Sequence, residues 1–168
     1  MDEKAEFEPP SDGELKNFTS WDWSRLLAGR PEFAEKCDKW EAFLGSDWAY
    51  LLCHQPQFAG RCLWDKLFHS DWQKLLSSQP QFAEKCGKWD RFTAQDWAFL
   101  LARQPQFEEN CHRWNEFEGS HWMWLLSHQE QFADLCRWDK LDREDWLLLL
   151  ERKPQFAGKC PFELKSGK

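Results

Sequence analysis

The side chains of this sequence best suited to metal binding or nucleophilic catalysis belong to its seven cysteines and five histidines. A zinc site needs four ligands that converge on one ion, and these ligands usually come in Cys-x-x-Cys or His-x-x-x-His spacing. Neither spacing occurs in the chain. We therefore expect no metal site and no bound cofactor.

Six of the cysteines recur in steps of 24 or 25 residues: Cys37, Cys62, Cys86, Cys111, Cys136 and Cys160. In a stack of helical repeats, equivalent residues of neighbouring repeats lie roughly 9–10 Å apart, whereas a disulfide needs Cα atoms within about 7 Å of each other. We expect these six cysteines to be reduced, buried and unbridged, and to pack as small apolar side chains.

Catalysis by a thiol would need a base that points at it. Cys53 precedes His54 and Cys111 precedes His112, but adjacent residues of a helix point in different directions. The chain also has no phosphate-binding glycine loop and no nucleophile elbow. We expect a protein that is not an enzyme.

The whole chain repeats with the period of the cysteines. Each copy contains one Trp in a fixed register: Trp23, Trp48, Trp72, Trp97, Trp122 and Trp146. Between this Trp and the next Cys, every copy has a Leu pair and a Phe, such as Leu51-Leu52 and Phe58. Six copies in one register indicate a repeat architecture, in which neighbouring units cover each other's apolar faces.

The first half of each copy predicts a helix. Trp48, Leu51 and Leu52 stand at i, i+3 and i+4, which is the spacing of one helical face. Thr19 and Thr93 each precede an Asp by three residues and so predict N-caps, while Ser46 or Ser70 would cap other copies. The residue before a proline avoids the α region. We therefore expect helix breaks at Gln55, Gln79 and Gln104.

The second half of each copy predicts another short helix. A proline suits the first position of a helix, and Pro56 or Pro80 would begin this one. Phe33, Cys37 and Trp40, at i, i+4 and i+7, would then lie on one face. Helices of about nine residues are too short to be stable alone, so stacking must stabilise them.

Composition supports an all-α fold, because the chain has no Val and no Ile, the residues that favour strands. We predict an α-solenoid of six helix-turn-helix repeats of 24–25 residues over residues 18–164. Residues 1–17 are acidic and contain Pro9-Pro10, which predicts a mobile arm or a partial cap. We expect residues 165–168 to form a C-terminal tail.

The pattern Asp-Trp-x-x-Leu-Leu-x-x-Gln-Pro-Gln-Phe-Ala-x-Lys-Cys-x-x-Trp resembles short Trp-rich helical repeats of uncharacterised bacterial proteins. The resemblance covers roughly residues 18–164, and the copy from Asp71 to Trp89 matches it best. It implies the helical fold and a bacterial or phage source, and it implies no particular activity. The pattern departs locally at Arg30, Glu130 and Lys153 in the proline corners, and at His121 in place of Asp.

The charge of the chain bears on its partners and location. Its net charge is −7, with both signs interspersed, so we expect no direct binding to a nucleic-acid backbone, which calls for clustered Lys and Arg. The longest apolar run, around Leu147 to Leu150, is far shorter than the ~20 residues of a membrane span. The first residues also lack a positively charged and apolar leader, so we expect a cytoplasmic protein without membrane contact.

One position of the first helix varies widely in chemistry, the second residue after the repeat's Trp. We call these residues the helix stripe: Arg25, Tyr50, Lys74, Phe99, Trp124 and Leu148. Aromatic residues and Arg are enriched at interface cores. The sequence therefore predicts a protein–protein interaction module that is a monomer or weak dimer and binds a protein or peptide through the helix stripe and the nearby His54, Arg103 and His128.

Other interpretations remain open. A phage or mobile-element inhibitor would use its acidic surface to imitate nucleic acid, and a metal or small-ligand sensor would use the Cys, His and Trp side chains. The stripe would equally serve only to contact a neighbouring repeat. The Gln-Pro-Gln corners have a structural interpretation, in which their stacked amides bond each other and satisfy the polar groups at the helix ends.

Overall fold

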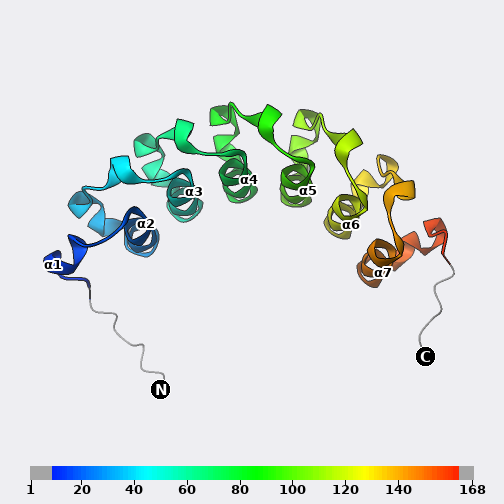
Figure 1. The fold of residues 1–168 in the computed structure, drawn as a ribbon, viewed down its shortest axis with the longest axis horizontal. Coiled ribbons are helices and arrows are strands. Elements are labelled where there is room, and N and C mark those ends of the chain that lie inside the picture. Colours follow the sequence, from blue (N-terminus) through cyan, green and yellow to red (C-terminus); the bar gives the residue numbers. More distant parts are fainter. Residues whose placement is uncertain (1–8, 163–168) are drawn as a thin grey trace, which may run out of the picture. The chain divides into compact units, whose positions relative to one another are not determined.

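Alternating α-helices and 3₁₀-helices make up the protein in a computed structural model that describes residues 9–162 (Figure 1). The α-helices are α1 (Asp12–Leu15), α2 (Ser20–Gly29), α3 (Gly45–His54), α4 (His69–Ser78), α5 (Ala94–Arg103), α6 (Gly119–His128) and α7 (Arg143–Arg152). The described range contains no strand. The predicted all-α solenoid of six repeats is confirmed, and α2 to α7 are the first helices of its repeats.

Each repeat follows its α-helix with two 3₁₀-helices. The longer ones are η1 (Pro31–Lys36), η3 (Pro56–Arg61), η5 (Pro80–Lys85), η7 (Pro105–Asn110), η9 (Glu130–Asp134) and η11 (Pro154–Lys159). The shorter ones are η2 (Trp40–Ala42), η4 (Trp64–Lys66), η6 (Trp89–Arg91), η8 (Trp114–Glu116) and η10 (Trp138–Lys140).

The prediction of a single second helix in each copy is wrong. Cys37, placed on one helical face with Phe33 and Trp40, has φ −77° and ψ 116° and separates η1 from η2. Its N–H donates to the carbonyl of Ala34, three residues earlier, which closes a 3₁₀ turn. The predicted spacing of apolar residues is present, but two 3₁₀-helices with an extended residue between them stand in place of the single predicted helix.

The described residues form two compact units, which are divided between Lys66 and Leu67. In the first unit, α2 packs against α3. In the second, α4 packs against α5, α5 against α6, and α6 against α7. Repeats within a unit thus bury their apolar faces on their neighbours, as the short length of each helix requires.

The predicted helix ends are confirmed. Gln55, Gln79 and Gln104 are the C-caps of α3, α4 and α5, with ψ between 71° and 74°. Thr19 and Thr93 are N-caps whose hydroxyl groups accept from the N–H of Asp22 and Asp96.

The alternative caps at Ser46 and Ser70 are wrong, because these residues lie inside α3 and α4. Leu44 and Phe68 are the N-caps there. The backbone N–H of Leu44 donates to Asp47 at 2.8 Å, so the Asp carboxylate satisfies the helix start even where the cap side chain is apolar.

The proline corners bond to the preceding repeat. Gln104 Nε2 donates to the carbonyl of Ser77 at 2.9 Å, and Gln129 Nε2 donates to that of Ala102 at 3.0 Å. Amide-to-amide bonding occurs instead within one corner, where Gln106 Nε2 donates to Gln104 Oε1 at 2.8 Å. At these two corners the amides therefore satisfy helix-end groups by bonding to backbone carbonyls of the preceding repeat.

Residues 9–17 of the predicted arm carry a short helix. Ser11 caps α1 through a capping box with Glu14, and Leu15 is buried. Asp12 forms an ion pair with Lys36 at 2.7 Å. The rest of the predicted arm, residues 1–8, and the tail at 165–168 lie outside the described residues.

Candidate functional site

In the first unit, three of the residues predicted for partner binding line one open cavity of about 730 Å³. Arg25 comes from α2, while Tyr50 and His54 come from α3. The other walls include Pro10 and Glu14 beside α1. The repeat register thus brings side chains from two neighbouring α-helices to one concave surface.

Aromatic contacts hold the Tyr50 ring in place. Its centroid lies 5.0 Å from that of Trp21 and 4.6 Å from that of His54. His54 Nδ1 lies 2.9 Å from the Tyr50 carbonyl, and because a carbonyl only accepts, Nδ1 donates. In neutral His54 the other ring nitrogen, Nε2, is then an acceptor.

Carboxylates near the cavity are already engaged in helix capping. Hydrogen bonds from the Ser11 side chain and backbone lower the pKa of Glu14, and those from Thr19 lower the pKa of Asp22. Both groups therefore stay ionised. Arg25 is exposed and lies within electrostatic range of Asp22. The cavity offers a cation, an imidazole and an aromatic wall to a ligand.

The second unit holds an aromatic cluster from α5 and α6. The Phe99 and Trp124 centroids are 4.9 Å apart, and those of Trp124 and His128 are 4.4 Å apart. Phe99 and Trp124 are half-buried, and Trp124 Nε1 is buried without a hydrogen-bond partner. These two rings therefore contact each other across the repeat boundary while keeping part of their surface exposed.

The remaining predicted residues are exposed on separate helices. Lys74 lies on α4, Arg103 on α5 and Leu148 on α7, with 49% of the Leu148 side chain exposed. The structure thus assembles the predicted set into two local groups, Arg25–Tyr50–His54 and Phe99–Trp124–His128, with single residues beside the second.

Sequence reasoning missed the wall that α1 contributes. Pro10, Glu14 and Phe18 line the cavity, yet they fall in or next to the segment interpreted as an arm. A signal was present, because Ser11 to Glu14 has the Ser-x-x-Glu spacing of a capping box.

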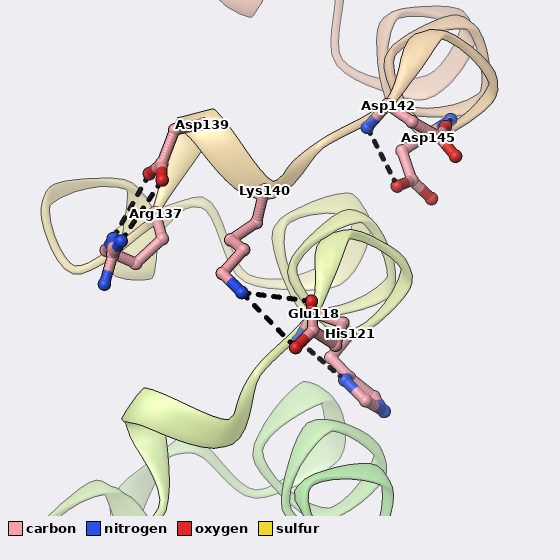
Figure 2. Close-up of polar contacts among 7 residues, drawn as sticks. All are labelled: Glu118, His121, Arg137, Asp139, Lys140, Asp142 and Asp145. Atoms are coloured by element: carbon pink, nitrogen blue, oxygen red, sulfur yellow. Dashed lines mark hydrogen bonds and ion pairs between the residues drawn. The ribbon is translucent and has the colours of Figure 1, made fainter.

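His121, which stands where the other repeats have Asp, belongs to a polar cluster at the starts of α6 and α7 (Figure 2). His121 Nδ1 accepts from the N–H of Glu118 at 3.0 Å, the role that Asp145 plays for Asp142 in α7. Lys140 Nζ pairs with Glu118 at 3.2 Å. Burial lowers the pKa of His121 and raises the pKa of Asp145. This cluster caps helices and joins neighbouring repeats.

No cysteine of the described range forms a disulfide, and five of the six in register are buried. Cys160 is the exception to the predicted burial, because it is half-exposed in the last repeat. Burial raises the pKa of Cys62 and Cys136 to about 12 and that of Cys111 to about 11. Such thiols are poor nucleophiles near neutral pH.

Neither a metal cluster nor a membrane span is found in the part of the chain that the structure describes. No three His, Cys, Asp or Glu side chains gather there in a way that would hold a metal ion. None of the helices in residues 9–162 is long and apolar enough to cross a bilayer.

The fold and these surfaces define a Trp-rich helical-repeat protein. No family model matches the chain, and no curated protein or solved structure matches it.

Proposed function

We propose that this chain is a non-enzymatic module that binds a protein or peptide partner through the helix stripe on its α-helices. The observation that carries the proposal is the cavity of about 730 Å³ that Arg25, Tyr50 and His54 line together. Its volume falls within the ~300–1,000 Å³ typical of ligand sites. On the resemblance to bacterial Trp-rich repeats, we take the module to act in the bacterial cytoplasm.

The chemistry of the cavity suits a peptide side chain. Arg25 offers a planar cation, and the Tyr50 ring, supported by Trp21, offers an apolar face. Tyr, Trp and Arg are the residues that contribute most to binding energy in interface cores. The mixed charge around the cavity favours a partner segment with both polar and apolar groups.

The aromatic cluster of the second unit supports the same function. Phe99 and Trp124 keep part of their surface accessible although each contacts the other at 4.9 Å. Half-exposed aromatic pairs give a large contact area at a low entropic cost, because their rings are already held by neighbours.

The test is affinity purification of partners from bacterial cell extract, followed by binding measurements with the purified partner. Arg25→Glu should weaken binding at least tenfold. Arg91→Glu makes the same change of charge at an exposed residue of η6 and should leave binding within twofold. Equal losses in both variants would contradict the proposal.

Salt dependence distinguishes the competing nucleic-acid mimic. Its affinity would arise from charge spread over the acidic surface, so binding would fall steeply as salt rises. Contact through Tyr50, Phe99 and Trp124 should keep most of its affinity at high salt. A steep salt dependence together with an unaffected Tyr50→Ala variant would favour the mimic.

A further inference from the structure

The α-helix α7 is the last one in the described residues, and it exposes a face that is covered in the preceding helices of its unit. In those helices, the next repeat packs against this face. Leu76, Leu101 and Leu126 are fully buried in α4, α5 and α6. Leu150 has the same place in α7 and is only half-buried. Leu147 is 50% exposed, whereas Ala98 at the matching place in α5 is 1% exposed.

The side chains on this face differ from those that pack against a following repeat. α5 has Ala94, Ala98 and Ala102 at its first, fifth and ninth positions, and all three are buried. α6 begins with Gly119, where an added Cβ would meet the carboxylate of Asp145 in the next repeat and would lie 2.5 Å from the carbonyl oxygen of Lys140, just before that repeat. The ninth position of α4 to α6 is always small: Ser77, Ala102 and Ser127.

α7 has Arg143, Leu147 and Glu151 at these three positions. A large first residue can be accommodated, because His69 at the start of α4 bonds to Asp96 of the next repeat at 2.7 Å. The ninth position is different. There, Glu151 would have to bury a carboxylate where Ser77 and Ala102 lie against the following repeat, which is unfavourable without a partner. The residues of α7 therefore argue against a further repeat of the same geometry on this face.

The charges on this face are self-complementary. Arg143 and Glu151 stand four residues before and four after Leu147. Both are exposed, and neither forms an ion pair with another residue of the 9–162 range. If two copies of α7 cross in antiparallel fashion at Leu147, each Arg143 meets Glu151 of the other copy. A parallel pairing would instead bring like charges together.

We propose that the α7 end face, formed by Arg143, Leu147, Leu150 and Glu151, binds the same face of a second copy of this chain in an antiparallel, two-fold arrangement. The contact continues the helix-to-helix packing that joins α4, α5, α6 and α7 within the chain. A two-fold axis makes the interface isologous, so a single complementary pair of charges acts twice. The proposal concerns a surface separate from the cavity and the helix stripe.

The size of this face predicts weak association. A ten-residue helix is about 15 Å long, so the contact is smaller than the ~1,200–2,000 Å² of a standard stable interface. We expect a monomer–dimer equilibrium that becomes visible at concentrations of the order of 100 μM, measured by sedimentation of the full chain.

Charge reversal gives the decisive test. Arg143→Glu alone and Glu151→Arg alone should each weaken self-association several-fold, because each places like charges opposite one another. The double variant Arg143→Glu/Glu151→Arg should restore it to within twofold of the wild-type chain. A double variant as weak as the singles would overturn the proposal.

Two matched Leu→Glu substitutions test where the self-association contact lies. Leu147→Glu should weaken self-association at least tenfold, whereas Leu135→Glu, at a similarly exposed leucine outside α7 and outside the helix stripe, should leave it unchanged. Equal effects, or a wild-type chain that stays monomeric at millimolar concentration, would overturn the proposal.

Hydroxyl-radical labelling of the full chain shows whether a second copy or the chain's own residues bury the α7 end face. The labelling of Leu147 and Leu150 should fall as protein concentration rises. Protection that is the same at every concentration would show that the chain covers this face with its own residues, and would also overturn the proposal.

Discussion

The indole of Trp89 stacks on the indole of Trp97, with ring centroids 5.6 Å apart and planes inclined by 15°. Trp89 begins a 3₁₀-helix and Trp97 lies in the following α-helix, α5. The same geometry joins Trp40 to Trp48, with centroids 5.7 Å apart. The stack connects the second half of one repeat to the first half of the next, so it couples neighbouring repeats through apolar contact.

Removing the buried partner of this stack should destabilise the protein strongly. Trp97 is 1% exposed, so Trp97→Ala opens a cavity between repeats and should cost about 3–5 kcal/mol. Trp21→Ala makes the same change at a side chain that is 42% exposed and should cost about 1 kcal/mol. Urea denaturation of both variants measures the difference, and similar costs would contradict this account of the core.

Gly119 allows two repeats to approach closely. A Cβ at this position would meet the Asp145 carboxylate and the Lys140 carbonyl oxygen, and the backbone atom cannot move away easily. Gly119→Ala should therefore destabilise the protein by about 1–3 kcal/mol. Gly87→Ala is the matched control, because a Cβ there has open space and the change should stay within about 0.5 kcal/mol. Thermal denaturation tests both, and an unaffected Gly119→Ala variant would refute the packing argument.

The thiols should differ in reactivity according to burial. Cys37, Cys62, Cys86, Cys111 and Cys136 are buried, and burial raises the pKa of each. At pH 8 they should react slowly with a disulfide reagent, while the half-exposed Cys53 and Cys160 react first. All seven should react once the protein is denatured. Rapid modification of more than two thiols in the native protein would show that the repeats open easily.

His121 should make stability depend on pH. Its Nδ1 accepts a hydrogen bond from Glu118, and burial lowers its pKa, so the folded protein favours the neutral ring. The unfolded chain has a histidine pKa of about 6.5 and binds the proton more readily. Stability from this group is therefore complete above about pH 6.5 and is lost as pH falls through the lower folded pKa.

The variant His121→Asn isolates this contribution. Asn offers an oxygen acceptor to the same N–H but does not titrate in this range. Between pH 7.5 and 5.5, the melting temperature of the wild-type chain should fall more than that of His121→Asn. Asp145 remains in both proteins, and its raised pKa acts with the opposite sign, so the difference between the two curves reports His121 together with its electrostatic effect on Asp145. Parallel curves would exclude a role for the ring.

Sequence periodicity predicted the elements that depend on local rules. The break at Gln104 follows from the proline after it, and the burial of Trp97 follows from its register with Leu100 and Leu101. Cys37 shows the limit of this reasoning, because spacings of four and seven residues fit an α-helix and also fit two 3₁₀ turns joined by an extended residue. The extended backbone of Cys37 and its hydrogen bond to Ala34 distinguish them.

The candidate site was predictable only in part. The variable position after each Trp identified Arg25 and Tyr50, since position in the repeat fixes the direction of a side chain. The cavity between them depends on where α1 lies, and α1 is outside the repeat pattern. Likewise, the contact of Phe99 with Trp124 depends on how two helices cross, which a one-dimensional pattern does not specify.

Binding and stability should separate at the helix stripe, which is the last prediction. Tyr50→Ala removes a half-buried ring that lines the cavity and should weaken partner binding by about 1–2 kcal/mol or more, as for an interface anchor. Trp124→Ala should also weaken binding. Its stability cost should lie between that of an exposed residue and that of the core, about 1–2 kcal/mol, because Trp124 is half-buried against Phe99.

Calorimetric titration with the partner and urea denaturation, applied to the same variants, measure the two effects separately. Leu148→Ala is informative because its side chain is 49% exposed, so a loss of binding there would come with almost no loss of stability. If Trp124→Ala destabilises the protein as much as Trp97→Ala does, the Trp124 ring belongs to the buried core and is not a partner-binding residue.

If Tyr50→Ala, Trp124→Ala and Leu148→Ala all bind as the wild-type chain does, the partner contacts another surface. The exposed glutamines of the proline corners, such as Gln57 and Gln106, then become the next residues to substitute.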